Sequence, residues 1–378
     1  MMEHAIPLIS TLPQVHRKVV DEQVQNVLDK SIIQPSKSPF LLLVVPKKGP
    51  TKYRVVIDYR KLNEATIGDA FPLPNVADIF DRLDFCQYFS TLDFASGYHQ
   101  IPVKPQNRQK STFSTQKGLY EFLRMPFGLK GAPATFQRAM NYALSGLNGI
   151  NCLIYLDDIV VFGKTLDDHL QKLEEVFERL QSFKLKLNAK KCFLLQKEIT
   201  YLGHVISEDG IRPDPEKISC IKNYPTPTNL KAVQAFLGLS NYYRRFIPNF
   251  SKIIQPMVNL TKKNLPFIWS ETVEKSFEAL KDALTSSLVI IFPNFKEKFI
   301  LTTDASDSAL GVIISQGEIG KDRPIAYGSR TLNSAERNYS TTEKELLAIV
   351  WGIHNFRPYL YGREFLVVTD HQPYGCLT

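Results

Sequence analysis

Two adjacent aspartates, Asp157 and Asp158, interrupt an apolar and β-prone stretch of the chain. The runs at residues 152–155 and 159–162 predict two strands joined by a tight hairpin, with both carboxylates at its tip. Like charges this close repel each other, and divalent cations would relieve that cost. Mg²⁺ fits, because it takes one or two protein carboxylates and leaves its other positions to water and phosphates. An acidic turn is the commoner meaning of such a pair, so the pair alone leaves both interpretations open.

A third aspartate, Asp93, follows the strand-like residues 88–92. Phosphoryl transfer with two metal ions needs a further carboxylate from a neighbouring strand to complete the clamp. We therefore predict that Asp93 joins Asp157 and Asp158 at one site that binds two Mg²⁺ ions.

The chain has 378 residues, which is too long for one comfortable core and predicts two or three domains. An irregular segment at 1–20 precedes mixed helix and strand patterns at 21–205, proline-jointed short helices at 206–294 and a strand-rich region at 295–378. Hydrophobic periodicity predicts helices at 21–31, 132–144, 167–183 and 341–356, and strands at 40–45, 53–57, 299–303, 310–315, 324–329 and 364–369.

Composition limits the function only weakly. The net charge of +8 and the pI near 9.0 suggest a polyanionic partner. Five scattered cysteines without a C-x-x-C pair argue against a zinc site or a disulfide framework and favour a reducing compartment. The longest apolar run near the start, residues 40–46, is far too short to span a bilayer, and no secretory h-region precedes it. We therefore expect a cytoplasmic protein with no membrane partner.

Five successive segments carry motifs that resemble those of one family. They are YRVVIDYRKLNEAT at 53–66, LDFASGYHQI at 92–101, MPFGLKGAPATFQ at 125–137, YLDD at 155–158 and YLGH at 201–204. In this order they closely resemble the reverse transcriptases of gypsy-type (Metaviridae) long-terminal-repeat retrotransposons. The resemblance extends from about residue 15 to 372, and the chain looks like a fragment of such an element's Pol polyprotein.

This resemblance implies an α+β fold: a right-hand polymerase with fingers, palm and thumb, followed by a truncated ribonuclease H-like α/β domain. The implied activity is that of an RNA-directed DNA polymerase, which extends a primer strand with dNTPs on an RNA or DNA template. Asp93 and Asp157 would be the principal Mg²⁺ ligands, and Asp158 would support them. The 3′-hydroxyl of the primer would attack the α-phosphate in line, with the two ions stabilising the attacking and leaving oxygens.

The same resemblance assigns a nucleotide-binding set. Lys47 and Arg54 match residues that hold the triphosphate, as a point charge and a bidentate fork. Arg54 is the stronger of the two, because Lys47 lies in a lysine-rich turn where a solvated side chain is the commoner role. Tyr98 matches the steric gate that selects dNTP over NTP, whereas without the motif a packing role would be favoured. Phe127 and Gly128 would line the nucleotide pocket, Gly128 by allowing close backbone approach.

The resemblance also places the contacts with the nucleic acid. The primer grip would consist of Tyr201, Leu202 and Gly203. Lys190 or Lys191 matches a lysine near the leaving pyrophosphate, and the sequence does not choose between them. The basic and aromatic residues at 242–245 resemble part of the thumb, whose basic side chains would neutralise phosphates of an A-like duplex.

A second acidic set lies in the region that resembles ribonuclease H. Asp304, Glu345 and Asp370 match its acidic positions, and three such acids would bind two further Mg²⁺ ions to hydrolyse RNA in an RNA/DNA hybrid. The sequence ends at Thr378, before the family's fourth acidic ligand and its remaining strand and helices. An incomplete core would leave the apolar face of the helix at 341–356 poorly covered. We therefore expect the ribonuclease H half to be weak, unstable or inactive.

Two other functions compete with the leading hypothesis. One is a non-catalytic nucleic-acid-binding remnant, or co-opted fragment, of a retrotransposon that keeps the fold without turnover. The other is a template-independent or DNA-templated polymerase, which would use the same metal chemistry. The intact acidic and nucleotide-binding positions favour the polymerase, and the sequence leaves the oligomeric state open.

Overall fold

The computed structural model describes residues 14–38, 44–49, 52–84, 86–115, 117–262, 266–286 and 289–369. They belong to two compact units. The first contains Met1–Asn75 and Ser90–Leu195, and the second contains Val76–Phe89 and Gln196–Thr378. Within the described ranges, no helix is long and apolar enough to cross a membrane.

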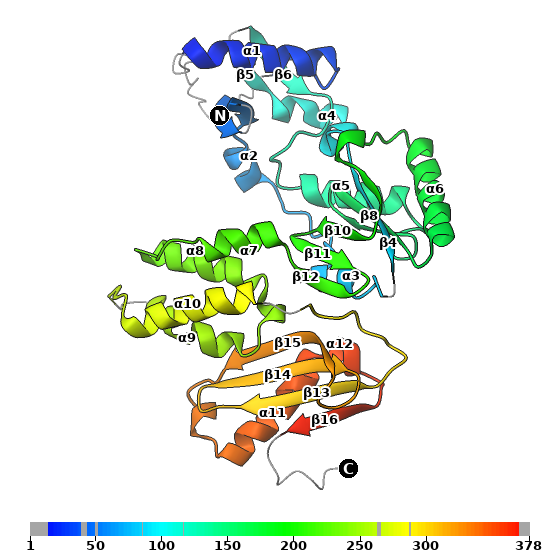
Figure 1. Cartoon of the computed structure of the whole chain (residues 1–378). Coiled ribbons are helices and arrows are strands. Elements are labelled where there is room, and N and C mark those ends of the chain that lie inside the picture. Colours follow the sequence, from blue (N-terminus) through cyan, green and yellow to red (C-terminus); the bar gives the residue numbers. More distant parts are fainter. Residues whose placement is uncertain are drawn as a thin grey trace. The chain divides into compact units, whose positions relative to one another are not determined.

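The main sheet of the first unit has the strand order β7-β8-β4-β9, and its two central strands are labelled in Figure 1. Its strands are β4 (Tyr88–Asp93), β7 (Cys152–Tyr155), β8 (Asp158–Gly163) and β9 (Phe193–Gln196). As predicted, β7 and β8 are antiparallel, with Asp157 in the turn between them, but Asp158 is the first residue of β8. Helix α5 (Ala132–Ala143) packs against β7, and helix α6 (Leu166–Ser182) packs against β8. Both helices lie within a residue of their predicted bounds.

Helix α6 illustrates why the sequence folds as it does here. The Thr165 side chain caps its N-terminus by accepting a hydrogen bond from the Asp168 N–H, which satisfies one of the free donors of the first turn. Leu173, Val176 and Leu180 then recur at helical spacing and are all buried in the core beneath the sheet. This stripe fixes the face that α6 presents to the sheet.

The remainder of the first unit carries a smaller sheet and a hairpin. The sheet, in the order β1-β6-β5, contains β1 (Ile33–Pro35), β5 (Phe113–Thr115) and β6 (Gly118–Phe122), and the hairpin contains β2 (Val44–Gly49) and β3 (Lys52–Ile57). Short helices α2 (Arg60–Ala65) and α4 (Pro105–Arg108) also belong to it. Of the residues expected in a turn at 47–52, 47–49 lie in β2 and Lys52 lies in β3.

Helix α1 (Gln14–Asp29) differs from the prediction, which began it at residue 21 and left 1–20 irregular. Val20 and Val24 are each only 5% exposed and pack with Ile33 and Phe113 in one core. The apolar stripe therefore begins earlier in the helix than the sequence suggested, because Val20 lies four residues before Val24.

The second unit begins with a small antiparallel sheet and a group of helices. The sheet contains β10 (Glu198–Tyr201), β11 (His204–Ser207) and β12 (Gly210–Pro213). The helices are α3 (Val76–Phe80), α7 (Pro215–Lys222), α8 (Leu230–Asn241), α9 (Phe250–Leu260) and α10 (Glu271–Thr285). The predicted texture of short helices joined at prolines is confirmed here.

The C-terminal part of the second unit contains a mixed sheet in the order β15-β14-β13-β16 (Figure 1). Its strands are β13 (Phe299–Ala305), β14 (Ala309–Gln316), β15 (Arg323–Thr331) and β16 (Phe365–Thr369). The first three are antiparallel neighbours, and β16 runs parallel to β13. Helix α11 (Thr341–Asn355) packs on β13 and β14, the short helix α12 (Arg357–Leu360) follows it, and α9 contacts β15. The predicted strand–strand–strand–helix–strand order is confirmed.

Candidate functional site

The acidic hairpin is a tight turn held in place by a buried glutamine. Tyr155 pairs with Asp158, so Leu156 and Asp157 form the turn, and Leu156 has a left-handed φ of 53°. The fully buried Gln137 of α5 accepts a hydrogen bond from the Leu156 N–H at 2.7 Å. Its amide also donates to Ile154 O at 3.2 Å. Gln137 therefore holds the turn in place through two backbone groups, a role that the sequence motif did not reveal.

The three predicted aspartates share one electrostatic environment. Burial, together with the charges of Asp158 and Asp93, raises the pKa of Asp157 to about 6 against the opposing effect of Lys191. Asp158 retains exposed surface, yet burial of its carboxyl and the Asp93 charge raise its pKa as well. Among the described residues, Asp157 Oδ1 is buried without a hydrogen-bond partner. The site therefore holds negative charge that the described side chains compensate only in part.

Lys191 supplies positive charge beside the aspartates. Its Nζ lies 3.3 Å from Asp93 Oδ2. Backbone hydrogen bonds hold its segment against the end of β4, from Asn188 N–H to Asp93 O at 2.8 Å and from Ala95 N–H to Lys186 O at 2.9 Å. Of the two lysines that the sequence left open, Lys191 is the one paired with a catalytic candidate.

The donor set fits a divalent cation that also uses non-protein ligands. In the described part of the chain, no group of three or more histidine, cysteine, aspartate or glutamate side chains could hold an ion by itself. Magnesium sites at phosphates commonly use one or two carboxylates and complete the shell with water and phosphate oxygens. The orphaned Asp157 Oδ1 and the repulsion between neighbouring carboxyls match that kind of ion.

Gly97 leaves room for the carboxylate, and Tyr98 lies beside it. A Cβ atom at Gly97 would lie 2.9 Å from Asp157 Oδ1, so only glycine fits without moving that side chain. The buried Tyr98 ring packs between Phe127 and Phe136, with centroids 4.9 and 5.1 Å away. Burial and the Asp157 charge raise the pKa of Tyr98. The predicted gate residue therefore lies at the acidic site, and the need for Gly97 was missed.

The predicted nucleotide-pocket residues lie on a loop that Asn63 clamps. Phe127 is 53% exposed, and Gly128 has a φ of 93°, a conformation that favours glycine. Asn63 donates to Gly128 O at 2.9 Å and accepts from the Lys130 N–H at 2.8 Å. Asn63 was not singled out from the sequence, because its partners lie more than 60 residues away along the chain.

The two predicted triphosphate-binding residues lie on the β2–β3 hairpin. Lys47 and Arg54 are directly paired across it in the backbone register. Their side chains lie outside the described part of the structure.

The predicted primer-grip residues form a second tight hairpin, in the second unit. Tyr201 is buried at the end of β10, and Leu202 and Gly203 form the turn with φ values of 47° and 68°. Positive φ at both central positions is the geometry of a type I′ turn, which suits a hairpin of two right-twisted strands.

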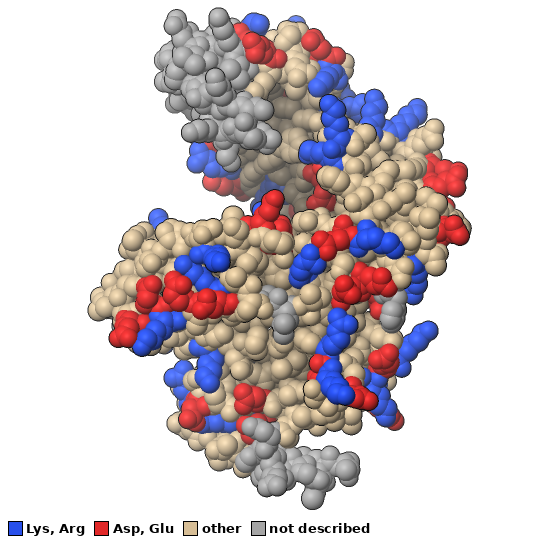
Figure 2. Space-filling model, viewed as in Figure 1, with Lys and Arg blue, Asp and Glu red and all other residues tan. Residues whose placement is uncertain are grey.

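The side chains of the 242–245 segment, whose basic members were expected to neutralise phosphates, contact other parts of the protein. The Tyr242 and Tyr243 hydroxyls donate to the carbonyls of the primer-grip turn. Arg244 donates to Ser329 O at 2.7 Å, and Arg245 lies 3.7 Å from Asp81 in a pair that is mostly buried. These polar groups bind the protein itself. On the face shown in Figure 2, basic and acidic side chains are interspersed over helix α10.

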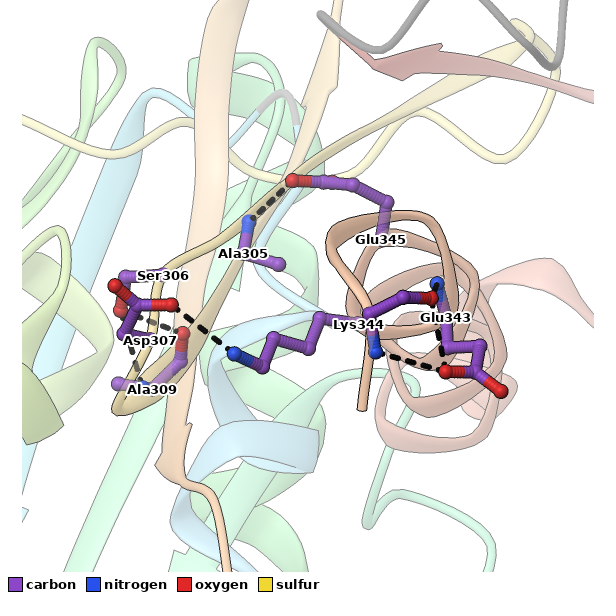
Figure 3. Close-up of polar contacts among 8 residues, drawn as sticks. Ala305, Ser306, Asp307, Ala309, Glu343, Lys344 and Glu345 are labelled. Carbon is purple, nitrogen blue, oxygen red and sulfur yellow. Dashed lines mark hydrogen bonds and ion pairs between the residues drawn. The ribbon is translucent and has the colours of Figure 1, made fainter. Parts of the chain in front are cut away.

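Two of the predicted ribonuclease H acids lie near the end of β13, one on that strand and one on the helix α11 that packs on it. Asp304 is exposed near the end of β13, and Glu345 of α11 is 4% exposed. Figure 3 shows Glu345 reaching toward the β13 backbone, where its Oε1 accepts from the Ala305 N–H at 3.2 Å. The backbone register pairs Thr303 with Thr369 of β16. Asp370, the third predicted acid, lies outside the described residues.

One face of α11 is apolar and open to solvent, as the sequence predicted. Leu346, Val350 and Ile353 are 44%, 58% and 39% exposed and recur at helical spacing. On the adjacent strand β16, Leu366 and Val367 are 47% and 40% exposed. Consecutive strand residues point to opposite faces, so both faces of β16 carry exposed apolar surface.

Comparisons with known proteins agree with this arrangement. A family model described as reverse transcriptase (RNA-dependent DNA polymerase) matches residues 45–206, and one described as an RNase H-like domain found in reverse transcriptase matches residues 269–367. The retrovirus-related Pol polyprotein from transposon 297 of Drosophila melanogaster is 49% identical over 381 residues, covering 98% of this chain and 36% of that protein. The Pol polyprotein from transposon gypsy of the same fly is 40% identical over 374 residues, covering 94% of this chain and 36% of that protein. The chain thus spans about a third of the length of these relatives.

Solved structures of foamy viral protease-reverse transcriptase share the fold. The complex with dsDNA has a TM-score of 0.86 at 24% identity, covering 99% of this chain and 79% of that one. The complex with an RNA/DNA hybrid has a TM-score of 0.79 at 24% identity, covering 95% of this chain and 49% of that one. The expected fold class, a polymerase followed by a ribonuclease H-like domain, is confirmed.

Proposed function

Because the chain belongs to the reverse transcriptase and ribonuclease H region of gypsy-type retrotransposon Pol polyproteins, we propose that it is an RNA-directed DNA polymerase. It extends a primer strand with dNTPs on an RNA or DNA template. The observation that carries this proposal is the cluster of Asp93, Asp157 and Asp158, with its raised pKa values and its orphaned carboxylate oxygen.

In this proposal the three aspartates hold two Mg²⁺ ions, which supply charge neutralisation and activate the primer 3′-hydroxyl when bound. The protein contributes position and electrostatics more than covalent chemistry. Gln137 and Gly97 keep the Asp157 carboxylate in place, the first through the turn backbone and the second through the space it leaves. Lys191 balances Asp93 in the free protein and becomes available to triphosphate oxygens once a cation takes over that charge.

Nucleotide selection is assigned to residues around Tyr98. Its ring, held between two phenylalanines beside Asp157, would lie under the incoming sugar and exclude a 2′-hydroxyl. Phe127 and Gly128 line the base and sugar side, on the loop that Asn63 clamps. Lys47 and Arg54, paired across the β2–β3 hairpin, bind the triphosphate.

The proposed domain organisation follows these roles. Residues 21–205 form fingers and palm, 206–294 form thumb and connection, and 295–378 form the ribonuclease H-like part. Tyr201, Leu202 and Gly203 grip the primer, and the partners are the template, the primer and an RNA/DNA hybrid. A cytoplasmic location stays a prediction.

A primer-extension assay on poly(rA)/oligo(dT) with Mg²⁺ tests the polymerase. We expect wild-type protein to extend the primer and Asp157→Asn to lose extension. Asp167→Asn, at an exposed aspartate in the first turn of α6, is the matched control and should extend as wild type does. Absent extension by wild type, or equal extension by wild type and Asp157→Asn, would favour a non-catalytic nucleic-acid-binding remnant.

We propose separately that the ribonuclease H half is weak, with Asp304, Glu345 and Asp370 as its metal ligands and up to two further Mg²⁺ ions. The support is the exposed apolar face of α11 and β16, which leaves the helix that carries Glu345 packed on one side only. A hybrid-degradation assay with this chain should show cleavage far slower than primer extension. Robust hybrid cleavage would refute the proposal that this half is weak. If Asp304→Asn abolished that cleavage, the proposed metal ligands would still stand.

A further inference from the structure

The Leu202–Gly203 turn has both of its carbonyl oxygens held by two donors each. Leu202 O accepts from the Tyr242 hydroxyl at 2.7 Å and lies 2.7 Å from His204 Nδ1. Gly203 O accepts from the Tyr243 hydroxyl at 3.0 Å and from the Asp214 N–H at 3.1 Å. A carbonyl oxygen has two lone pairs, so each acceptor is saturated.

This arrangement fixes which ring nitrogen of the histidine carries a proton. Because a carbonyl only accepts, the Nδ1 of His204 carries the proton that it donates to Leu202 O. His204 is 2% exposed, and burial, with a contribution from the Arg245 charge, lowers its pKa to about 4. The imidazole is therefore neutral near pH 7, and it packs against the rings of Tyr242 and Tyr243 at 5.2 and 5.3 Å.

Two-residue hairpin turns with glycine at the second position form without such support. The donors at this turn come from three separate segments: the strand after the turn, the start of α7 and the residues that follow α8. Together these hydrogen bonds fix the orientation of the turn's peptide planes as well as the course of its backbone. It also joins the hairpin to the end of α8, because Tyr242 is the residue that caps that helix.

Because these peptide planes are fixed, the direction of the Gly203 N–H is fixed as well. In a trans peptide the C=O and the N–H point in opposite directions. Leu202 O faces Tyr242 and His204, so the N–H of Gly203, in the same peptide unit, points away from them. Backbone N–H groups are common ligands of nucleic-acid phosphates, and a glycine lets the phosphate approach closely.

We infer that Tyr242 and Tyr243 are positioning residues that aim the Gly203 N–H at a phosphate near the 3′ end of the primer. This inference rests on the proposed primer-binding role of the hairpin. The tyrosine hydroxyls bind the turn backbone and do not contact the primer. Removing them therefore leaves the Gly203 N–H in place but no longer fixes its direction.

The test compares Tyr242→Phe, Tyr243→Phe and the double variant with Tyr224→Phe in the full chain. Tyr224 is the matched control, since its hydroxyl donates to a backbone carbonyl of α8, Ala232 O, at 3.4 Å, away from the hairpin. Each protein is titrated with a fluorescent primer–template whose last four primer linkages are replaced, one at a time, by uncharged methylphosphonate. The readout is the ratio of Kd values for the modified and unmodified duplex.

We expect wild type and Tyr224→Phe to lose affinity on the order of tenfold at one linkage, the loss of one charge-assisted hydrogen bond. The double variant should bind the unmodified duplex more weakly and show a ratio near one at that linkage. A ratio that is the same in all proteins, or no sensitive linkage in wild type, overturns the inference. Primer extension by the same proteins reports separately on the polymerase proposal, because the binding ratio needs no turnover.

Discussion

Among single residues, Gly97 shows how closely the acidic site is packed. A Cβ atom there would lie 2.9 Å from Asp157 Oδ1 and 3.0 Å from the Phe136 ring. We predict that Gly97→Ala displaces the carboxylate and lowers single-turnover primer extension by roughly tenfold or more, since about 1.4 kcal/mol of misplacement gives a factor of ten. Single-turnover rates at saturating dNTP measure this effect.

Gly238→Ala is the control for the glycine substitution. Gly238 is exposed within α8, and a Cβ atom added there would meet no neighbouring side chain within 4 Å, so alanine should raise stability by about 0.5–1 kcal/mol. A Gly97→Ala protein that extends primers at the wild-type rate would contradict the proposed packing around Asp157.

Gln137 makes a different prediction, because its role is to satisfy backbone groups of the acidic turn. Gln137→Met keeps most of the volume but leaves the Leu156 N–H and Ile154 O without their partner. Each buried group left unpaired costs about 1–3 kcal/mol, so we expect a loss of that order in urea unfolding together with slower extension. Gln171→Met, at a residue whose amide bonds Glu175 on exposed α6 surface, should change neither. Equal behaviour of the two variants would show that the turn does not depend on Gln137.

At the scale of elements, α11 has one covered and one open face. Val350 is 58% exposed, whereas Ala348 on the covered face is fully buried. We predict that Val350→Ser changes the free energy of unfolding by no more than about 0.5 kcal/mol. Ala348→Leu should cost about 1–3 kcal/mol by overpacking. Urea denaturation followed by circular dichroism compares the two, and a large loss from Val350→Ser would mean that this face is covered in solution.

The elements themselves were largely predictable from local patterns. Alternating and helical periodicities gave β7, β8, α6 and the strand order around α11, because burial on one face repeats along the sequence. The early start of α1 was missed, because Pro13 precedes the helix and its first turns are rich in polar and basic residues. The extension of β2 to Gly49 was missed because glycine and lysine favour turns.

At the scale of the whole molecule, the sequence predicted the acids but not most of the residues that hold them. Motifs supplied Asp93, Asp157 and Asp158, since their residue types and order are specific. Partners such as Gln137 and Asn63 are joined to the site by contacts between distant parts of the chain, which periodicity does not encode. The basic side chains after α8 were expected to neutralise phosphates, whereas Arg244 donates to Ser329 O and Arg245 pairs with Asp81.

The stability of the whole chain should depend on pH and Mg²⁺ through Asp157. Its pKa is about 6 in the folded protein against 3.8 for an ordinary aspartate carboxyl, so folding favours the protonated form. Its contribution to stability is complete below about pH 3.8 and is lost as the pH rises through about 6.

Mg²⁺ binds the ionised carboxylates, so it should raise the melting temperature by roughly 1–3 °C at pH 8 and much less at pH 5. In Asp157→Asn the charge is absent, so the metal-free variant should melt above wild type at pH 8 and respond less to Mg²⁺. Thermal melts of both proteins at pH 5 and 8, with EDTA or Mg²⁺, measure these differences, and a Mg²⁺ shift independent of pH would argue that the aspartates do not bind the ion.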